Sequence, residues 1–483
     1  MTAVRRETAA GTVHRGELPD SRDPSLDDES KQPVVTHAAI SGTKPMTGDT
    51  VHDPAGIRAR VERKLTVRLI VPIALITFVN SIDRVNVSYA GSAMSSDLGL
   101  SPAQFGQGVS MFFVAYLLFQ YPHVRLLKAW GIKLWILLSM VLWGCSSLWM
   151  ARIGSAGEFY AARFLLGMAE AGFAPGMTWL ISQWTPPSIR ARALAGALVA
   201  VPLSMVLGGP LCGWLLGAAS PLGLESWRFM FLVLAVPNFI LAFVAALYFV
   251  DRPDKARWLS EEERTWLASE FRVQEGAPGP MVSLGDIARD PWLWRCAASW
   301  LLIMTGAYAL VFWLPQLVRQ LAIGGSEFAI GALSALPLLG LAIGLMLNGR
   351  RSDRTGERLL HTGVPSAMAG VVMLIAALLQ PGWPVLALLV VAGLGIGAAQ
   401  GVFWAVPGKV GIGGNKVPVG AIALISMFGT AGGIIGPWLT GALVAATDSF
   451  SLAIAVLASL LILALPVIAL RPAATRKPAA DLS

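Results

Sequence analysis

Residues 67–90 read VRLIVPIALITFVNSIDRVNVSYA, an apolar segment interrupted by the adjacent charges Asp83 and Arg84. A second apolar segment, residues 159–182, carries Arg163 and Glu170. A charge at membrane depth costs about 2.5–3.5 kcal/mol on insertion scales, so such residues normally face a cavity or one another. Arg163 and Glu170 are two helical turns apart and project from one face, whereas Asp83 and Arg84 point in different directions. One carboxylate and one guanidinium on each of two helices predict a proton and anion site.

The composition of the chain excludes an ordinary globular enzyme. Of its 483 residues, 55% are hydrophobic and only 14% are charged, which is typical of an integral membrane protein. Apolar stretches long enough to cross a hydrocarbon core recur about twelve times. We therefore predict an all-α polytopic bundle, because in lipid every backbone polar group must be bonded within its own helix. The predicted spans are residues 67–90, 105–125, 133–152, 159–182, 192–217, 228–250, 293–318, 328–348, 361–380, 384–406, 418–445 and 449–470.

The net charge of +8 reflects membrane topology rather than a nucleic-acid partner. The basic residues cluster in alternate loops: Arg125, Lys128 and Lys133; Arg190 and Arg192; Arg350, Arg351, Arg354 and Arg358; Lys409 and Lys416. The intervening loops are nearly free of them, with Arg152, Arg228 and Arg319 as exceptions. By the positive-inside rule the rich loops are cytoplasmic. We predict a multi-pass protein of the inner membrane with both termini in the cytoplasm.

The polar segments divide the chain into halves. We expect residues 1–65 to be a disordered cytoplasmic tail, 66–250 a six-helix half, 251–291 a cytoplasmic linker, 292–471 a second six-helix half and 472–483 a cytoplasmic tail. Within the linker, Ser260 followed by Glu263 is a capping-box pattern, and Trp258, Trp266 and Phe271 supply an apolar stripe. The linker therefore predicts a surface helix over residues 259–271, and it is too short for a soluble catalytic domain.

Glycines and prolines recur at corresponding places in the two halves. The fifth span contains Gly208, Gly209, Pro210 and Gly213, and the eleventh contains Gly432, Gly433, Gly436, Pro437 and Gly441. Glycines let helix backbones approach closely, and prolines supply kinks. Because transporters are often built from such repeats, we expect these positions to serve conformational change, above all Gly209, Pro210, Gly436 and Pro437.

A short basic turn follows the eighth span. It reads GRRSDRTGER over residues 349–358, where Asp353, Arg354 and Arg358 can pin a helix end by charge-assisted bonds and Gly356 permits a tight reversal. The turn resembles the cytoplasmic signature of the major facilitator superfamily, GxxSDRxGER. The counterpart in the first half, residues 122–133, keeps Gly131 and basic residues but lacks the Asp.

That departure narrows the resemblance toward the anion:cation symporter branch, which includes permeases for sugar acids, tartrate, phthalate and other carboxylates. Further similar stretches are IDRVNVSYA from Ile82, RFLLGMAEAGFAPG from Arg163, SQWTPPSIRARA from Ser182, GGPLCGWLLG from Gly208 and VFWAVPG from Val402. The resemblance covers roughly Thr66 to Leu470. It implies the two-half facilitator fold and transport by alternating access.

The resemblance also implies roles for the membrane charges. Asp83 and Glu170 stand where the branch has proton-titrating carboxylates, and loading an anion onto a nearby arginine can toggle such a group. Arg84 matches an arginine that faces the substrate carboxylate, for which a guanidinium fork is suited. Arg163 looks like the family residue that pairs with carboxylates, so we interpret it as a charge partner, with direct substrate contact as its alternative. For Asp83 and Glu170 the alternative is a static ion pair that only locks helices, and for Arg84 it is a structural role.

Aromatic residues extend the predicted substrate site. Tyr116 matches a family tyrosine beside the cavity and could donate a hydrogen bond to an oxyanion. Tyr308 and Trp313 in the seventh span, with Phe403 and Trp404 in the tenth, could form an aromatic wall, although packing is a usual role for such residues.

The eleventh span departs from its relatives. Many of them carry asparagines in a pattern like INSxGNxGG, whereas this chain reads ISMFGTAG over residues 425–432. Fewer amides, with Met427 and Phe428 nearby, favour a less hydroxylated anion, aromatic or heteroaromatic, over a sugar acid.

Together these patterns predict proton-coupled uptake of a small organic carboxylate, of the tartrate, sugar-acid or aromatic-acid class. An efflux antiporter for hydrophobic compounds and a non-transporting membrane sensor are the alternatives. We expect no enzyme, since no nucleophile–base pair, metal cluster or phosphate loop appears outside the spans. We also expect no metal, no cofactor besides coupling protons, no nucleic-acid partner, and a monomer in contact with membrane lipid.

Overall fold

The structure is a computed structural model that describes residues 54–272, 285, 288–409 and 417–470. Contacts divide the chain after His52, and every described helix belongs to the unit Asp53–Ser483. The expected C-terminal tail, most of the expected N-terminal tail, part of the linker and Lys416 lie outside the described residues.

The described residues form helices joined by short connections and contain no β-strand. The first group comprises α1 (Pro54–Leu65), a π-helical turn (Thr66–Ile70), α2 (Val71–Leu98), α3 (Pro102–Met150), α4 (Ala156–Glu170), α5 (Phe173–Trp184), α6 (Pro187–Leu198), α7 (Ala200–Gly217) and α8 (Ser226–Tyr248). A 3₁₀ turn (Pro253–Lys255) and α9 (Glu261–Arg272) follow. The second group comprises α11 (Pro291–Gln320), α12 (Glu327–Thr355), α13 (Leu359–Leu378), α14 (Trp383–Phe403), α15 (Val406–Lys409), α16 (Val419–Thr447) and α17 (Phe450–Ala469).

Eleven helical segments among the described residues are long and apolar enough to cross a membrane. One of them, α3, covers two predicted spans. The backbone leaves helical geometry between these spans, at Gly131, with φ 78° and ψ 169°. Gly131 suits this left-handed conformation because it has no Cβ. The Asp251 carboxylate then accepts a hydrogen bond of 3.2 Å from the Lys133 backbone N–H, at the start of the second part. The predicted all-α polytopic bundle of about twelve spans is confirmed.

Two predicted spans are each broken into two helices. Residues 159–182 divide into α4 and α5, and residues 192–217 divide into α6 and α7. The first break follows Glu170 directly, and Gly172 there packs so closely on His123 that a Cβ would overlap the imidazole. Glu170 therefore lies at the carboxyl end of α4 rather than in the middle of a continuous helix.

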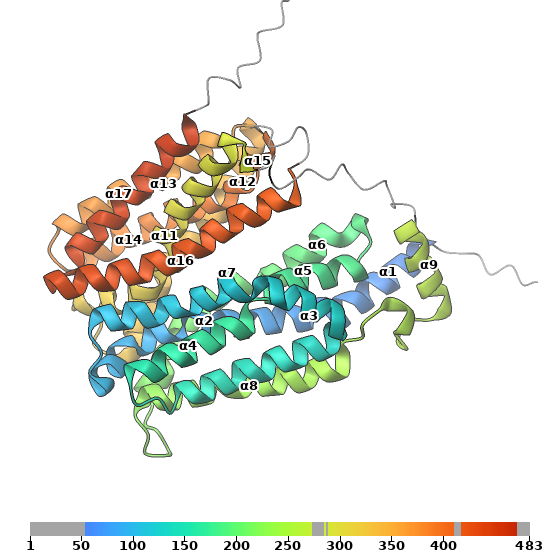
Figure 1. Ribbon diagram of the computed structural model, residues 1–483, viewed down its shortest axis with the longest axis horizontal. Coiled ribbons are helices and arrows are strands. Elements are labelled where there is room, and N and C mark those ends of the chain that lie inside the picture. The colour runs from blue at the N-terminus through green and yellow to red at the C-terminus, as the bar shows by residue number, and fades with distance from the viewer. Residues whose placement is uncertain (1–53, 273–284, 286–287, 410–416, 471–483) are drawn as a thin grey trace, which may run out of the picture. The chain divides into compact units, whose positions relative to one another are not determined.

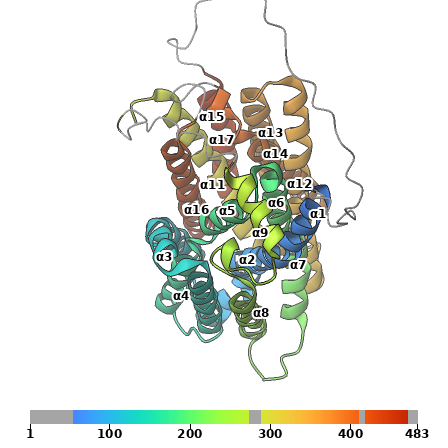
Figure 2. The same cartoon turned by 90° about the vertical axis from the view of Figure 1, so that its right-hand side faces the viewer.

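The helices form two groups that meet along α7 with α12 and along α3 with α16 (Figure 1). Figure 2 looks onto the end that carries α1, α6 and α9. At these meeting lines the helices touch backbone to backbone, since a Cβ at Gly209 would overlap the carbonyl oxygen of Gly331. Small residues permit this approach between membrane helices.

Residues 54–65 depart from the predicted disorder, because they form α1. This helix is held by an Arg58–Glu62 pair one turn apart and by a face on which Val61 and Leu65 are buried. Its Lys64 ammonium donates to the Glu263 carboxylate at 2.6 Å and to the Trp258 carbonyl at 3.0 Å. The sequence resembles a disordered tail because its apolar stripe is too short to cross a membrane. In the structure that stripe packs on the rest of the protein instead.

The predicted linker helix is present as α9. Its capping box is complete: the Ser260 hydroxyl accepts from the Glu263 N–H at 3.2 Å, and the Glu263 carboxylate accepts from the Ser260 N–H at 2.8 Å. Burial alone would raise the pKa of Glu263, but the bonds from Lys64 and Ser260 outweigh it and hold that pKa below its usual value. Trp258, Trp266 and Phe271 are half-buried against the core, as the apolar stripe predicts.

Candidate functional site

A cavity of about 950 Å³ lies between α3 and α5 of the first group and α11 and α16 of the second. Among the described residues that line it, Arg84 of α2 is the one that carries a charge. Aromatic and apolar side chains supply most of the wall, with a few amides and hydroxyls among them. They include Phe112, Phe113, Tyr116, Gln120, Trp179, Tyr308, Ser426, Met427 and Thr430. The described lining therefore offers a single cation within a largely apolar surface.

Beyond the cavity the same helices close against one another, in a region that we call the seal. Ser110 of α3 donates to the Ile434 carbonyl of α16 at 2.7 Å, and a Cβ at Gly441 would overlap the carbonyl oxygen of Pro102. Along α3 the cavity-lining residues run from Phe112 toward Val124, and the seal lies before them. The cavity and the seal thus occupy successive parts of α3 and of α16, which is the arrangement of a site closed from one side.

Arg84 reaches from α2 to Glu170 at the end of α4. Its Nη2 lies 3.0 Å and its Nε 3.3 Å from one oxygen of the Glu170 carboxylate. Glu170 is fully buried, whereas a quarter of the Arg84 side chain is exposed to the cavity. The guanidinium also lies over the rings of Phe112 and Tyr116, at 5.3 and 5.2 Å from their centroids. The ion pair therefore presents its cation, not its anion, to the cavity.

Arg163 also lies over the Phe112 ring but is not among the described residues that line the cavity. It is fully buried, and its guanidinium lies 4.9 Å from the centroid of that ring. Its Nη2 donates to the Arg84 carbonyl at 3.4 Å, and its Nε and Nη1 have no hydrogen-bond partner among the described residues. In the part of the chain that the structure describes, the close ion pair joins Arg84 to Glu170, so Arg163 stands near the predicted carboxylates without a salt bridge to either.

Asp83 points away from the cavity, as expected for the neighbour of Arg84. Its carboxylate is buried against α8, where Asn238 donates to one oxygen at 2.5 Å. Asn86, one turn along α2, donates to the other oxygen at 3.4 Å. The two predicted proton carriers therefore lie in separate environments, one paired with the cavity-lining Arg84 and one bonded by Asn238.

The predicted aromatic wall is only partly present. Tyr116 and Tyr308 line the cavity, and Phe113 packs against Tyr308 with ring centroids 4.6 Å apart and the rings tilted by 55°. Trp313 lies instead in the seal, where its indole N–H donates to the Pro437 carbonyl at 3.1 Å. Trp404 is not among the lining residues and packs at the edge of Trp300. Whether Trp313 and Trp404 face the cavity depends on how α11 and α14 are rotated about their own axes. The sequence pattern does not predict that rotation.

Comparison with known proteins decides the family. Residues 73–411 match the model of the Major Facilitator Superfamily. The chain belongs to that superfamily. Among its relatives, a protein named "Putative tartrate transporter" from Agrobacterium vitis is 36% identical over 411 residues, which cover 84% of this chain and 93% of the relative.

Other relatives of this facilitator carry different names. The "Quinolone resistance transporter" of Acinetobacter baumannii is 33% identical over 389 residues, covering 79% of this chain and 88% of its own. The "Inner membrane transport protein RhmT" of Escherichia coli (strain K12) is 34% identical over 417 residues, covering 84% and 95%. These are transporters, so the expectation of a transporter rather than an enzyme is confirmed.

The fold agrees with solved facilitator structures. A bacterial homologue of the human lysosomal transporter Spinster, in an inward-facing and unoccupied conformation, superposes with a TM-score of 0.66. The two sequences are 16% identical, and the superposition covers 89% of this chain and 96% of the homologue. The likeness establishes the facilitator fold.

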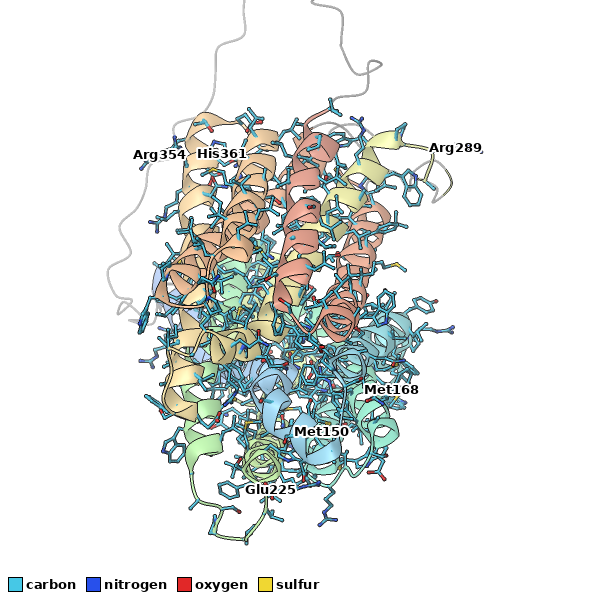
Figure 3. All side chains as sticks on the ribbon, turned by 90° about the vertical axis from the view of Figure 1, so that its left-hand side faces the viewer. Met150, Met168, Glu225, Arg289, Arg354 and His361 are labelled. Atoms are coloured by element: carbon cyan, nitrogen blue, oxygen red, sulfur yellow. The ribbon has the colours of Figure 1, made fainter. Side chains whose placement is uncertain are left out.

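The facilitator signature turn is held by its own residues. Arg358 lies 2.8 Å from the Asp353 carboxylate and donates to the Ser352 hydroxyl at 2.9 Å. Gly356 ends α12 in the left-handed conformation, with φ 70°, which is the tight reversal that its position predicts. Arg354 and His361 lie near one another at this end of α12 and α13, away from Met150 and Glu225 (Figure 3).

The predicted hinge glycines lie at close helix contacts. Gly209 touches Gly331 of α12, whereas Gly436 packs on the Thr305 carbonyl of α11 within the second group. Pro210 and Pro437 lie inside α7 and α16, both of which continue past them. Their predicted part in conformational change stays a prediction.

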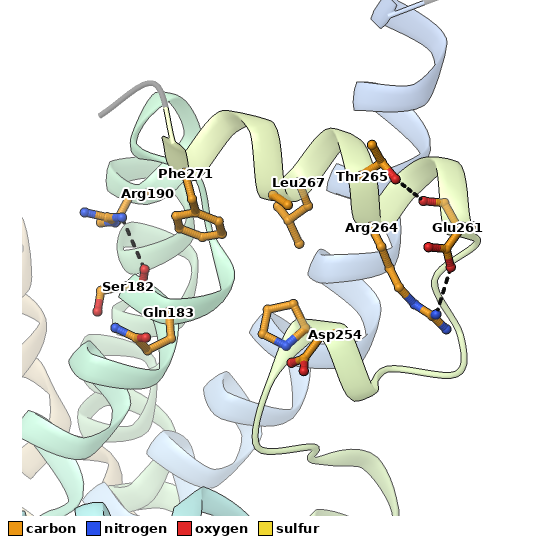
Figure 4. A pocket seen from close by; sticks show the side chains of 11 residues that line it. Ser182, Gln183, Arg190, Asp254, Glu261, Arg264, Thr265, Leu267 and Phe271 are labelled. Atoms are coloured by element: carbon orange, nitrogen blue, oxygen red, sulfur yellow. Dashed lines mark hydrogen bonds and ion pairs between the residues drawn. The ribbon is translucent and has the colours of Figure 1, made fainter. Parts of the chain in front are cut away.

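A second hollow lies under α9, outside the bundle interior. It measures about 760 Å³ and is lined by residues of α5, α6 and α9, among them Ser182, Arg190 and Phe271 (Figure 4). Arg190 is occupied there by the Ser182 and Thr185 carbonyls, at 3.2 Å each. The central cavity, not this hollow, contains the membrane charges.

Sequence reasoning missed two residues of the site. Asn238 donates a hydrogen bond to Asp83, but no sequence motif marks it. A single amide in an apolar helix is common and does not by itself indicate a functional role. Phe112 contacts the guanidinium groups of both Arg84 and Arg163, a position that depends on three helices. The only available signal was its place one helical turn before Tyr116, on the same face of α3.

Proposed function

We propose that this facilitator couples proton movement to the uptake of a small organic carboxylate, and that an aromatic monocarboxylate fits it best. The observation that carries the proposal is Arg84, the one cation among the described lining residues of the cavity, exposed there beside Phe112 and Tyr116. A guanidinium binds a carboxylate through two parallel hydrogen bonds. The surrounding rings suit the apolar body of the ligand.

The lining argues for one negative charge rather than two. A dicarboxylate such as tartrate needs a second cation, and Arg163 is fully buried and is not among the described residues that line the cavity. The described lining has one amide, Gln120, and Ser426 and Thr430 stand where the pattern of relatives has asparagines. A polyhydroxylated acid would leave several hydroxyls without partners in a desolvated site.

The Arg84–Glu170 pair links the anion to a proton. While Glu170 is charged it occupies the guanidinium, so an incoming carboxylate must compete with it. Protonation of Glu170 ends that competition and frees the Arg84 fork for the ligand. Binding of the anion and uptake of a proton then favour each other, as linkage requires.

Alternating access would follow from the cavity and the seal. The seal along Ser110, Ile434 and Pro437 would open as the cavity end closes, with the helix groups rocking over their glycine contacts. By the positive-inside rule the cavity end faces the cytoplasm, since it adjoins the loops of Lys128 and Arg190. We assign the chain to the inner membrane with both termini inside.

One observation favours a second function, efflux of hydrophobic compounds. The cavity wall is rich in aromatic side chains, and one relative is named a quinolone resistance transporter. Quinolones carry a carboxylate on an aromatic body, so the same Arg84 could bind them. A deletion strain that becomes sensitive to quinolones, without losing growth on benzoate, would favour efflux.

Ligand-induced stabilisation of the purified protein tests the proposed substrate class. Benzoate, tartrate and glucarate are added at matched concentrations, and unfolding temperature is measured. We expect benzoate to raise the unfolding temperature of the wild type, because a ligand at about 100 times its dissociation constant adds about 2.7 kcal/mol to the free energy of unfolding. Arg84→Ala should show no such rise, because it lacks the residue that binds the carboxylate. Stabilisation by tartrate alone would make the monocarboxylate assignment wrong, and stabilisation of Arg84→Ala by benzoate would make the site wrong.

A further inference from the structure

The contact between α2 and α8 encloses a carboxylate that the cavity does not reach. Asp83 and Asn238 are both buried, and the amide nitrogen of Asn238 lies 2.5 Å from one carboxylate oxygen. The same nitrogen lies 3.4 Å from the Leu234 carbonyl within α8. Asn86 reaches the second carboxylate oxygen more weakly, at 3.4 Å.

The other groups that face Asp83 come from α4 and α7. Arg163 and Glu170 act on it through charge, and the Cys212 thiol of α7 lies within reach of its charge. The close ion pair of this layer belongs to Arg84 and Glu170, so Asp83 has amide donors where Glu170 has a cation. Its charge is therefore satisfied by hydrogen bonds, chiefly the one from Asn238.

An amide can bond a carboxyl group in either protonation state. A charged carboxylate only accepts hydrogen bonds, whereas the protonated acid also donates one. The Asn238 amide carries both a donor and an acceptor, and its oxygen has no hydrogen-bond partner among the described residues. Rotation of the amide would bring that oxygen to the acid proton without moving either helix.

The place of this amide on α8 gives the bond a structural consequence. Pro237 precedes Asn238 inside the helix, and a proline removes one backbone hydrogen bond from the helical ladder. The helix is therefore weakened where it contacts Asp83. A change in the Asp83–Asn238 bond acts on α8 at this weak point.

We propose that Asn238 is the positioning residue that holds charged Asp83 against α8 and keeps the contact, by turning its amide, when Asp83 is protonated. The amide thus lets a membrane carboxylate change its protonation state without losing the helix contact. This inference deepens the proposed proton coupling and rests on it for its part in transport.

A double-mutant cycle in the full-length purified protein tests the bond directly. Unfolding temperatures of wild type, Asn238→Leu, Asp83→Asn and the double variant are measured from about pH 5 to about pH 9. We expect the deficit of Asn238→Leu to widen with rising pH, by roughly 2–4 °C, because charged Asp83 then lacks its donor. In the Asp83→Asn background the deficit should be the same at every pH. Asn238→Ala provides the same comparison should the leucine variant not fold.

Asn86→Leu is the matched control, since it removes the longer bond to the same carboxylate. Its pH-dependent deficit should be less than half of that of Asn238→Leu. A deficit of Asn238→Leu that is constant across pH, or one that persists with its pH dependence in the Asp83→Asn background, would overturn the proposal and leave Asn238 as a packing residue.

Uptake of labelled benzoate in proteoliposomes separates this inference from the proposed function. If wild-type uptake ignores an imposed pH gradient while the cycle shows the expected pH dependence, the proposed coupling fails and the bond stands. If wild-type uptake follows the gradient while the cycle shows no pH dependence, the assignment of Asn238 fails alone.

Discussion

The two buried carboxylates of this facilitator are stabilised by different chemistry. Glu170 is buried and paired with the cavity-lining Arg84, whereas Asp83 is buried against α8 and bonded by Asn238. Asp83 and Arg84 are consecutive on α2, so a single helical step separates the two environments. Burial of a charge is costly in both, and each is offset by specific partners.

The difference determines which charge a ligand can reach. Arg84 is exposed to the cavity, so an incoming carboxylate can replace Glu170 as its partner. The Asp83 partner is a neutral amide in the helix interface, where no ligand enters. We infer that Glu170 responds to the anion directly, and that Asp83 responds through the packing of α2 on α8.

Loss of Arg84 should have the largest effect on this comparison. Arg84→Ala should reduce benzoate uptake by more than about 100-fold, because it removes the residue that binds the anion. It also leaves the buried Glu170 unpaired, which should lower the free energy of unfolding by about 3–5 kcal/mol. Arg84→Lys should keep a trace of uptake, since an ammonium cannot form the bidentate contact. The measurement is uptake of labelled benzoate in proteoliposomes.

The double variant Arg84→Ala/Glu170→Gln is the control for folding. It should recover the unfolding temperature that Arg84→Ala loses, since residue 170 no longer carries an unpaired charge, and still take up no benzoate. Recovery of uptake in the double variant would place the anion ligand elsewhere.

Neutralising each carboxylate should separate the two environments at the level of binding. Glu170→Gln should bind benzoate about tenfold more tightly near pH 7, because Arg84 no longer has a competing anion; a tenfold change is about 1.4 kcal/mol. Asp83→Asn should stay within about threefold of wild type, since its side chain faces α8. Isothermal titration of the purified proteins measures both, and equal effects of the two substitutions would remove the distinction.

Phe112 should contribute a smaller term on the cavity side. Its ring contacts the guanidinium groups of both Arg84 and Arg163, and each cation–π contact is worth about 0.5–2 kcal/mol. Phe112→Leu should therefore weaken benzoate binding by roughly three- to tenfold. Phe119→Leu, on the same helix but outside the cavity lining, is the matched control. Equal losses in both variants would mean that the ring only packs.

The partly exposed ion pair between α1 and α9 should show the smallest effect. Lys64→Ala should lower stability by about 1 kcal/mol or less, because Lys64 is partly solvated. The Glu263 pKa is lowered in the fold, so the stabilisation is present above the usual glutamate pKa of about 4.3 and lost as the pH falls below it.

Unfolding temperatures of Lys64→Ala and wild type should accordingly converge in acid. Lys255→Ala, an exposed lysine of the linker, is the control and should match wild type throughout. A difference that grows as the pH falls would contradict the assigned direction.

Much of the fold follows from the sequence, because lipid imposes a strict rule. Apolar length alone located the spans within a few residues, and helical periodicity predicted that Asp83 and Arg84 diverge. The capping pattern of Ser260 and Glu263 likewise predicted the start of α9. These features depend on local chemistry, which the sequence contains.

The remaining features depend on contacts between distant helices. No local signal places Asn238 beside Asp83, and Trp313 is assigned to the seal only once the rotation of α11 is known. The break after Glu170 also escapes prediction, because the residues there are Ala171 and Gly172, which are common within membrane helices. Each partner is chosen by tertiary packing that a single sequence does not contain.

Gradient-driven uptake by Glu170→Gln tests the central claim most directly. Wild-type and variant protein are reconstituted into proteoliposomes, and accumulation of labelled benzoate is followed with and without an inward proton gradient, alongside benzoate exchange at equal pH. The account predicts that the wild type accumulates benzoate only with the gradient, while Glu170→Gln exchanges it without accumulating it under either condition. Accumulation by Glu170→Gln equal to wild type, or wild-type accumulation indifferent to the gradient, would contradict it.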